Sequence, residues 1–153
     1  MTVSPPVTFF LHDAAEVCLC WGDVVVPVVP ARLSAGAFSC VRVTADPSAR
    51  RPTYVNHAAD EVFHVLSGSF AITTGDADPV PLEVGSVAWV PRGRPRRLEV
   101  TGDSPGTVLV MVTPGDTLDD LLATLRRMPA ADAAGSGIGA EVLARCGIEI
   151  VQV

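Results

Sequence analysis

Residues whose side chains could do chemistry gather near the middle of the chain. Tyr54, Asn56, His57 and Glu61 lie close together on the approach to a predicted strand, and Arg96 follows one hairpin later. A histidine or a carboxylate can move a proton, and a guanidinium can stabilise an enolate or a carboxylate. The residue types therefore indicate acid–base and electrostatic chemistry, with His57, Glu61 and Arg96 as the candidate catalytic residues.

The neighbouring residues are candidates for binding a substrate. Tyr54 and Asn56 would offer donors and acceptors at the mouth or wall of a pocket. Phe63 should line the interior together with the carboxylate two residues before it, because alternate residues of a strand point to the same face. Trp89 is a second candidate for the interior, with Val90 as the alternative inward residue.

These side chains must be positioned by many short strands. Turn signals rich in Gly, Pro and Asp separate short apolar segments that recur about every ten residues, which is typical of an all-β sandwich or barrel. The expected strands are 17–21, 24–29, 37–44, 61–66, 69–74, 82–84, 87–90, 96–100 and 108–113. Pro27 lacks a backbone N–H, so the second of these segments is expected at an edge position.

The spacing of the apolar residues changes from that of a strand to that of a helix after Pro114. Leucines in an i, i+3, i+4, i+7 pattern from Leu118 to Leu125 predict a helix packed on the barrel, with Asp116 or Thr117 as its N-cap. Residues 130–139 are interpreted as a flexible linker. A short second helix is expected at 141–145, and a last strand at 148–153.

The composition limits the class of protein. The chain has 153 residues, which is a single-domain length. Its net charge of −6 argues against nucleic-acid binding, and the lack of lysine removes Schiff-base chemistry. The four cysteines form no CxxC pair and are interpreted as buried thiols. No apolar run reaches about 18 residues, so no membrane contact is expected. The N-terminus lacks the pattern of a secretory signal, so the expected location is the cytoplasm.

Two motifs resemble those of the cupins. The segment NHAADEVFHVLSG contains the DEVF-x-VL-x-G part of the first cupin motif, and Gly85, Pro91 and Gly93 match the G-x5-P-x-G frame of the second. The chain is most similar to short single-domain cupins of the quercetin-dioxygenase-like type. The resemblance implies one domain over 1–153, a cupin jelly-roll β-barrel with one or two C-terminal helices. Its core would span about 36–114, followed by a helical extension over 116–153.

The resemblance also implies a metal site of three histidines and one glutamate, which this sequence only partly retains. Glu61 matches the glutamate, but Arg96 stands at the third histidine, and a guanidinium cannot ligate a metal. The first two histidines fall, according to the alignment, on Tyr54 and Asn56 or on Val55 and His57. The only good metal ligands that can remain are His57 and Glu61, and Arg96 and Glu61 could instead form an ion pair in the place of the metal.

Three functions follow from these residues. The first is a cofactor-free cyclase, isomerase or lyase that acts on a hydrophobic small molecule, such as a natural-product intermediate. The second is a dioxygenase with one divalent transition metal on His57 and Glu61, aided by Asn56 or Tyr54. The third is a non-catalytic binding module, expected if the Arg96–Glu61 pair and aromatic residues plug the barrel. A homodimer is expected from the family and from the apolar N-terminal strands, which could pair across two subunits.

Overall fold

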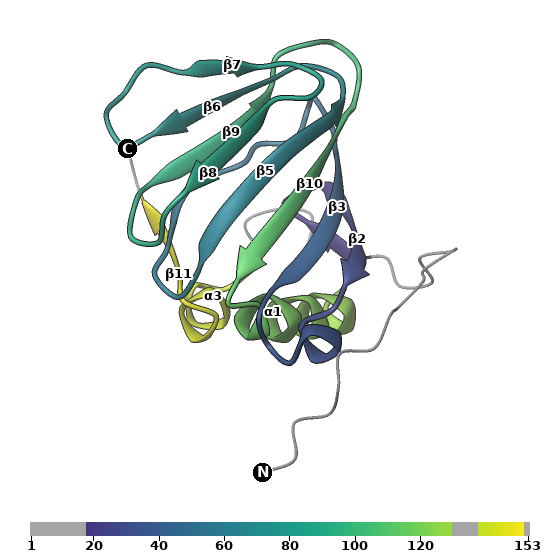
Figure 1. Cartoon of the computed structure of the whole chain (residues 1–153), viewed down its shortest axis with the longest axis vertical. Coiled ribbons are helices and arrows are strands. Elements are labelled where there is room, and N and C mark those ends of the chain that lie inside the picture. Colours follow the sequence, from purple (N-terminus) through teal and green to yellow (C-terminus); the bar gives the residue numbers. More distant parts are fainter. Residues whose placement is uncertain (1–17, 130–137, 152–153) are drawn as a thin grey trace.

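The chain forms a jelly-roll β-barrel of two facing antiparallel sheets (Figure 1). The computed structural model describes residues 18–129 and 138–151. One sheet has the order β1-β2-β3-β10-β5-β8, and the other has the order β11-β4-β9-β6-β7. The all-β jelly roll predicted from the sequence is confirmed. Residues 130–137 of the predicted linker and the last two residues of the predicted final strand lie outside the described part.

The described residues contain eleven strands, a 3-10 turn and two α-helices. The six-stranded sheet contains β1 (Cys18–Cys20), β2 (Asp23–Val29), β3 (Ser39–Ala45), β5 (Asp60–Ser67), β8 (Val87–Val90) and β10 (Gly106–Thr113). The five-stranded sheet contains β4 (Thr53–Asn56), β6 (Phe70–Thr74), β7 (Val80–Leu82), β9 (Arg96–Val100) and β11 (Ile148–Val151). The remaining elements are η1 (Ala31–Ser34), α1 (Asp116–Arg127) and α3 (Ala140–Arg145).

Three details of the strands differ from the prediction. β7 spans Val80–Leu82 and not the predicted 82–84. The short strand β4 carries Tyr54 and Asn56 and was not predicted as a strand, because four residues with Pro52 before them give little alternation. β2 is not an edge strand, since it pairs with both β1 and β3. The pairing of β2 with β1 ends at Val25, so no strand lies beside Pro27 on that side. The missing N–H of Pro27 therefore breaks no hydrogen bond with β1.

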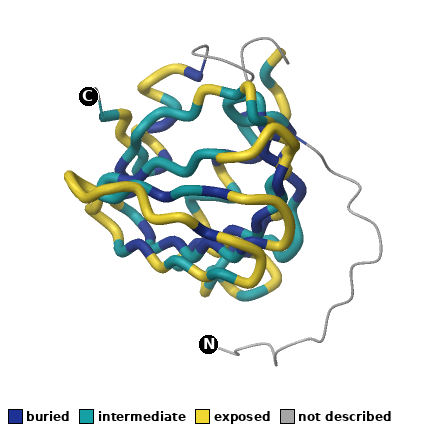
Figure 2. Tube along the Cα trace, turned by 90° about the horizontal axis from the view of Figure 1, so that it is seen from above, coloured by how far each residue is buried: buried dark blue, intermediate teal, exposed yellow. Residues whose placement is uncertain are grey.

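The core lies between the two sheets. Along β5 the side chains of Glu61, Phe63 and Val65 are buried, and the residues between them are more exposed, as expected for the period of two. Val110 of β10 pairs with Phe63, and Val112 pairs with Glu61. Each fully buried apolar side chain contributes about 1.5–3 kcal/mol. Figure 2 shows the buried positions along the inner strands and the exposed ones in the connections.

Both helices lie at one end of the barrel (Figure 1). The predicted leucine face of α1 is confirmed, but Gly115, not Asp116 or Thr117, precedes the first helical residue as the N-cap. A Cβ at Gly115 would lie 2.3 Å from the backbone nitrogen of Ser39, so only glycine permits this close approach. Asp119 accepts hydrogen bonds from the Ser39 hydroxyl at 2.9 Å and the Ala31 amide at 2.8 Å, which fixes α1 to the barrel. No helix in the described ranges is long and apolar enough to cross a membrane.

Candidate functional site

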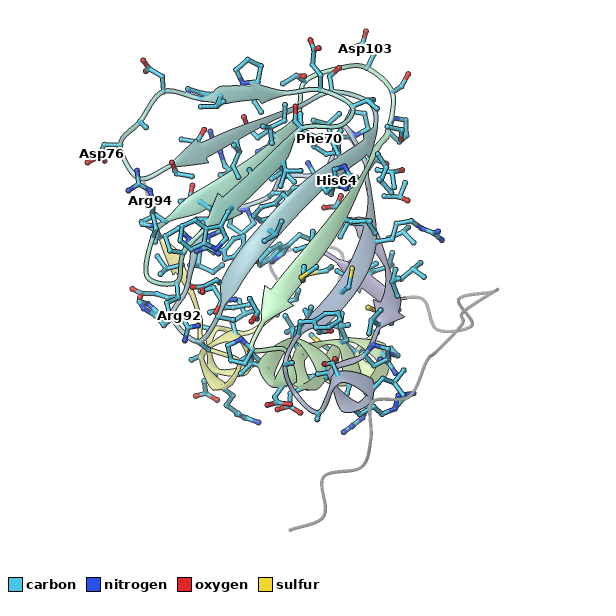
Figure 3. All side chains as sticks on the ribbon, in the orientation of Figure 1. His64, Phe70, Asp76, Arg92, Arg94 and Asp103 are labelled. Atoms are coloured by element: carbon cyan, nitrogen blue, oxygen red, sulfur yellow. The ribbon has the colours of Figure 1, made fainter. Side chains whose placement is uncertain are left out.

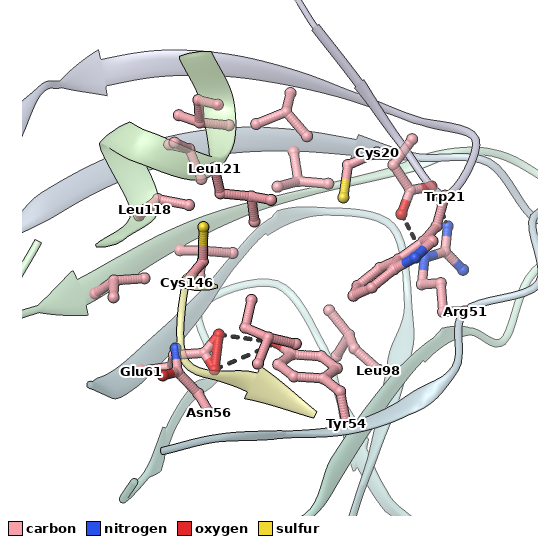
Figure 4. A pocket seen from close by; sticks show the side chains of 18 of the residues that line it. Cys20, Trp21, Arg51, Tyr54, Asn56, Glu61, Leu98, Leu118, Leu121 and Cys146 are labelled. Carbon is pink, nitrogen blue, oxygen red and sulfur yellow. Dashed lines mark hydrogen bonds and ion pairs between the residues drawn. The ribbon is translucent and has the colours of Figure 1, made fainter. Parts of the chain in front are cut away.

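The barrel encloses a mainly apolar cavity. The volume of the cavity is about 130 Å³, so the barrel is not plugged. Valines of the six-stranded sheet and leucines of α1 form much of its wall, and Phe63 adds one aromatic face. Figure 4 shows polar side chains at the two ends, with Glu61 and Asn56 at one end and Arg51 at the other.

Glu61 is the centre of the first polar cluster, which joins the two sheets. Glu61 lies on β5, whereas Tyr54 and Arg96 are cross-strand partners on β4 and β9. The Tyr54 hydroxyl donates a hydrogen bond to Glu61 Oε1 at 2.8 Å, and Arg96 Nη1 forms an ion pair with Glu61 Oε2. The Arg96 guanidinium also lies 5.5 Å from the centre of the Tyr54 ring. The three side chains therefore hold one another in place.

Arg96 lies behind this cluster and is not among the residues that line the cavity. It is 1% exposed, and its Nη2 donates to the carbonyl oxygens of Pro91 at 2.9 Å and Arg94 at 3.0 Å. These bonds fix the guanidinium, and its charge is neutralised by Glu61. The ion pair predicted from the sequence is present, and it leaves the carboxylate accessible from the cavity.

Asn56 completes the cluster. Its side-chain oxygen accepts hydrogen bonds from the backbone amides of Ala58 and Ala59, both at 3.0 Å, at the turn between β4 and β5. The oxygen is therefore occupied, and the amide nitrogen is the group that is available to donate a hydrogen bond to Glu61. The turn thus sets which end of the Asn56 side chain faces the carboxylate.

Burial changes the acidity of the cavity residues. Burial raises the pKa of Glu61, and the Arg96 charge and hydrogen bonds from Tyr54, Arg96 and Asn56 partly oppose this. The pKa of Tyr54 lies well above its usual value, first because of burial and then because of the Glu61 charge. Tyr54 therefore stays protonated as a donor. Burial also raises the pKa of Cys20 to about 12, so this thiol is not a nucleophile at neutral pH.

A second polar cluster lies at the other end of the cavity. Arg51 Nε donates to Asp23 Oδ2 at 2.6 Å, and Arg51 Nη2 forms an ion pair with Asp23 Oδ1. The Trp21 ring lies beside them, with its centre 5.5 Å from that of Tyr54. Trp21 and Arg51 were not identified from the sequence, because they lie outside both motifs and only the fold brings them to the cavity.

Four of the seven predicted site residues line the cavity, namely Tyr54, Asn56, Glu61 and Phe63. Two predicted placements are wrong. His57 follows the last residue of β4, so its side chain points out of the barrel, where its Nε2 lies 2.7 Å from Glu149 Oε2. Trp89 is 63% exposed, whereas Val90 is 2% exposed and pairs with Glu61, so the alternative inward residue is the observed one.

The remaining arginines of the second motif lie outside the barrel. Arg92 and Arg94 are exposed at its outer edge (Figure 3), and Arg92 forms an ion pair with Asp60 at 3.1 Å. This agrees with the frame of the motif, which assigns only Arg96 to the interior.

The exposed position of His57 gives a first prediction. We expect His57→Ala to leave activity unchanged and to lower the free energy of unfolding by no more than about 1 kcal/mol, because exposed ion pairs contribute little. Urea unfolding and the exchange assay described below would check this. Glu149→Ala is the matched control, since it removes the same pair from the other side, and a large loss of activity on His57→Ala alone would contradict the placement.

The donor set does not fit the metal centre that the resemblance implies. Of its four positions, the interior retains only Glu61, and the Arg96 guanidinium pairs with that carboxylate. His57, the other potential ligand, lies outside the barrel. Among the residues that the structure describes, no three His, Cys, Asp or Glu side chains are grouped as a metal site requires.

Comparison with known proteins identifies the fold. Residues 41–112 match the family model described as a cupin domain. No curated protein matches the sequence. Among solved structures, a cupin-superfamily sugar phosphate isomerase from Silicibacter pomeroyi DSS-3 is similar, with 22% identity and a TM-score of 0.52. The similarity covers 60% of this chain and 59% of the isomerase, which is less than two thirds of its length.

Two further solved structures are similar to this chain. The Streptomyces protein Pac13, described as a nucleoside dehydratase, has a TM-score of 0.57 in a complex with uridine, at 15% identity over 71% of this chain and 84% of that one. KdgF from Halomonas sp. has a TM-score of 0.55 at 16% identity, over 71% and 94% of the two chains. At these identities the similarity identifies the fold, and the chemistry must be argued from the residues.

Proposed function

We propose that this chain, whose residues 41–112 match a cupin domain, is a small-molecule enzyme that works by acid–base chemistry without a metal cofactor. The observation that carries the proposal is Glu61. It is a buried carboxylate of raised pKa that faces an apolar cavity, and a tyrosine and an arginine hold it in place. Such an environment makes a carboxylate a stronger base than it is in water, which suits a general base.

In the proposed reaction, Glu61 removes a proton from a carbon next to a substrate carbonyl. The Tyr54 hydroxyl turns from Glu61 to the carbonyl oxygen and stabilises the enolate by a hydrogen bond. Arg96 keeps the carboxylate oriented and ionised before the transfer. Return of the proton to another carbon completes an isomerisation. In a cyclase, the enolate carbon would instead attack a second carbonyl carbon of the same substrate, and the proton held by Glu61 would pass to the oxygen of that carbonyl. Loss of hydroxide from the neighbouring carbon, with the proton from Glu61, completes a dehydration.

The pairing of charges in the cavity indicates a neutral substrate. Glu61 is neutralised by Arg96 and Asp23 by Arg51, so neither end offers an unpaired charge to a phosphate or a carboxylate. The valine and leucine walls favour a mainly hydrocarbon body. A sugar phosphate would lose its hydration without a partner here, so we propose a neutral, mainly apolar compound with a carbonyl group. A dehydration would require a hydroxyl group as well, and a ring closure a second carbonyl group.

Two alternatives from the sequence have less support. A dioxygenase requires metal ligands, and the interior offers Glu61 without His57 beside it. A non-catalytic binding module was expected if the barrel were plugged, and the cavity argues against that expectation. The homodimer stays a prediction. Its support is that β1 lies at a sheet edge, and that Val87 and Trp89 on the other edge strand are 61% and 63% exposed.

The proposal can be tested by proton exchange with solvent. The protein would be incubated in deuterium oxide with neutral ketones of increasing size, from cyclohexanone to 2-tetralone, and deuterium incorporation next to the carbonyl followed by NMR. Incorporation above the buffer rate, which disappears on Glu61→Gln, would support the proposal. Ketones that bind, as measured by thermal shift, and yet exchange at the buffer rate would count against acid–base chemistry and favour the binding module.

Tyr54→Phe gives a second prediction. We expect deuterium exchange to fall by about 10²–10³-fold, because the variant loses the donor to the enolate and keeps the ring against Trp21. The lost hydrogen bond to the carboxylate should also lower the free energy of unfolding by about 1.5–3 kcal/mol. Phe63→Leu, a cavity variant without a polar change, is the control. Exchange that survives in Tyr54→Phe at the wild-type rate would exclude the proposed role of the hydroxyl.

A further inference from the structure

An outer groove lies next to the cavity at the end opposite Glu61. Its walls come from the β1–β2 turn, the segment before β4 and the region of α3 and β11, and it includes Arg50, Leu143 and Ile150. Trp21 and Pro52 line both this groove and the barrel cavity. At this place the two spaces are therefore separated by the side chains of two residues.

The backbone of Trp21 is unusual for a bulky residue. Trp21 and Gly22 form the two-residue turn between the paired residues Cys20 and Asp23, with φ values of 51° and 89°. Positive φ values suit glycine or asparagine in such a turn, and a tryptophan there is strained. Such strain persists where contacts of the side chain compensate for it. Here the indole packs on the Tyr54 ring at an interplanar angle of 42° (Figure 4).

The Asp23–Arg51 ion pair fixes both sides of this wall. Asp23 directly follows the turn that carries Trp21, and Arg51 directly precedes Pro52. Both side chains are less than a tenth exposed, and Arg51 also donates to the Asp46 carbonyl oxygen at 2.9 Å. The pair therefore links the two segments between which a molecule would have to pass.

The other end of the cavity offers less opportunity for passage. Leu121, Leu122 and Leu125 of α1 line the cavity there and are at most 4% exposed. The helix that carries them is fixed to the barrel by Asp119. Opening that end would require a twelve-residue helix to move. On the groove side, the indole that follows a three-residue strand could rotate beside Pro52 without breaking the Asp23–Arg51 pair.

We propose that neutral apolar molecules reach the barrel cavity from the outer groove past Trp21, and that Trp21 thereby determines which ligands reach Glu61. The route itself does not depend on catalysis, whereas the effect on substrate choice rests on the proposed function. Both ion pairs at the ends of the cavity are neutral as pairs. Charged molecules therefore gain no partner to offset their desolvation on this route.

Two cysteines allow the route to be tested without a substrate. Cys146 lines the cavity on the side away from Trp21 (Figure 4), and it is 5% exposed. Cys40 is 9% exposed and does not line the cavity. The probe is neutral methyl methanethiosulfonate, whose sulfenyl sulfur is attacked by the thiolate with release of methanesulfinate. Peptide mass spectrometry gives the rate of labelling at each cysteine separately.

We expect Trp21→Gly to increase the rate of labelling at Cys146 by about tenfold or more, without a change at Cys40. Glycine suits the positive φ of this turn, so the fold should be kept. The anionic sulfonatoethyl reagent should label Cys146 slowly in both proteins. Trp89→Gly, which removes the exposed tryptophan, is the matched control and should leave both rates unchanged.

An unchanged rate at Cys146 in Trp21→Gly would overturn the proposal and place the route elsewhere. Equal increases at Cys146 and Cys40 would mean general loosening of that variant, and Trp21→Phe would then decide. This smaller aromatic residue should give an intermediate rate of labelling at Cys146, with the rate at Cys40 unchanged. If the rate at Cys146 did not increase in Trp21→Phe, the proposal would be overturned. If the wild type shows no exchange activity, but Trp21→Gly still increases the rate of labelling at Cys146, only the proposed function is contradicted and the route stands.

Discussion

Replacing Arg96 by methionine is expected to lower the free energy of unfolding by about 3–5 kcal/mol at pH 8. The change leaves the Glu61 carboxylate buried without its counter-charge, and removing one member of a buried ion pair has this effect. The side chain of methionine keeps most of the packing volume. Urea unfolding, followed by far-UV circular dichroism, would measure the change. Arg94→Met is the matched control, because that side chain is exposed and should change stability little.

The decrease in the free energy of unfolding caused by Arg96→Met should depend on pH. Burial raises the pKa of Glu61, and the Arg96 charge opposes this, so the variant should have a still higher pKa at Glu61. A carboxyl whose pKa is raised in the folded state contributes stability below its unfolded value of about 4.3 and loses it as the pH rises through the folded pKa. The variant should therefore be closer to the wild type at pH 5 than at pH 8. If Arg96→Met lowered the free energy of unfolding equally at pH 5 and pH 8, Glu61 would not carry the unpaired charge.

Replacing Glu61 by glutamine should abolish most of the activity. We expect deuterium exchange to fall by about 10²–10⁴-fold, which is the usual contribution of a general base. Glutamine keeps the shape of the side chain and an acceptor for the Tyr54 hydroxyl, so ketone binding should change little. Because the variant leaves the buried Arg96 without its counter-charge, urea unfolding must show that it is folded under the assay conditions. In the wild type, exchange should decrease in acid as Glu61 is protonated, with a midpoint above the ordinary value for glutamate.

A surface variant separates this effect from a general change of charge. Glu83→Gln removes one exposed carboxylate and should leave exchange at the wild-type rate. If Glu61→Gln retained the wild-type exchange rate while binding the same ketones, Glu61 would not be the base, and the polar cluster would have only a structural role.

The sequence was sufficient to predict the barrel because each strand has its own local signal. β8 and β9 were predicted to the residue, since Gly85, Pro91 and Gly93 mark their ends, and the leucine period of α1 was equally clear. The same reasoning failed for His57, because spacing alone did not show that β4 ends one residue earlier. For Trp89 it left two registers open, and the pairing of Val90 with Glu61 decides between them.

The far end of the cavity could not be predicted in this way. Arg51 contacts Asp23 across 28 residues, and neither belongs to a motif. The leucines of α1 were predicted to pack on the barrel, which they do, but only the fold shows that they also line the cavity. Trp21 carried one signal that could have been used, namely its position before Gly22 in a two-residue turn between apolar segments.

The central claim is that Glu61 transfers a proton without a metal ion. The most direct measurement is deuterium exchange of a bound ketone by protein dialysed against a chelator, compared between the wild type and Glu61→Gln. Our account predicts full exchange by the chelator-treated wild type and exchange near the buffer rate by the variant. Exchange that is lost on chelation and restored by iron, manganese, nickel, copper or zinc would contradict it and favour the metal-dependent enzyme.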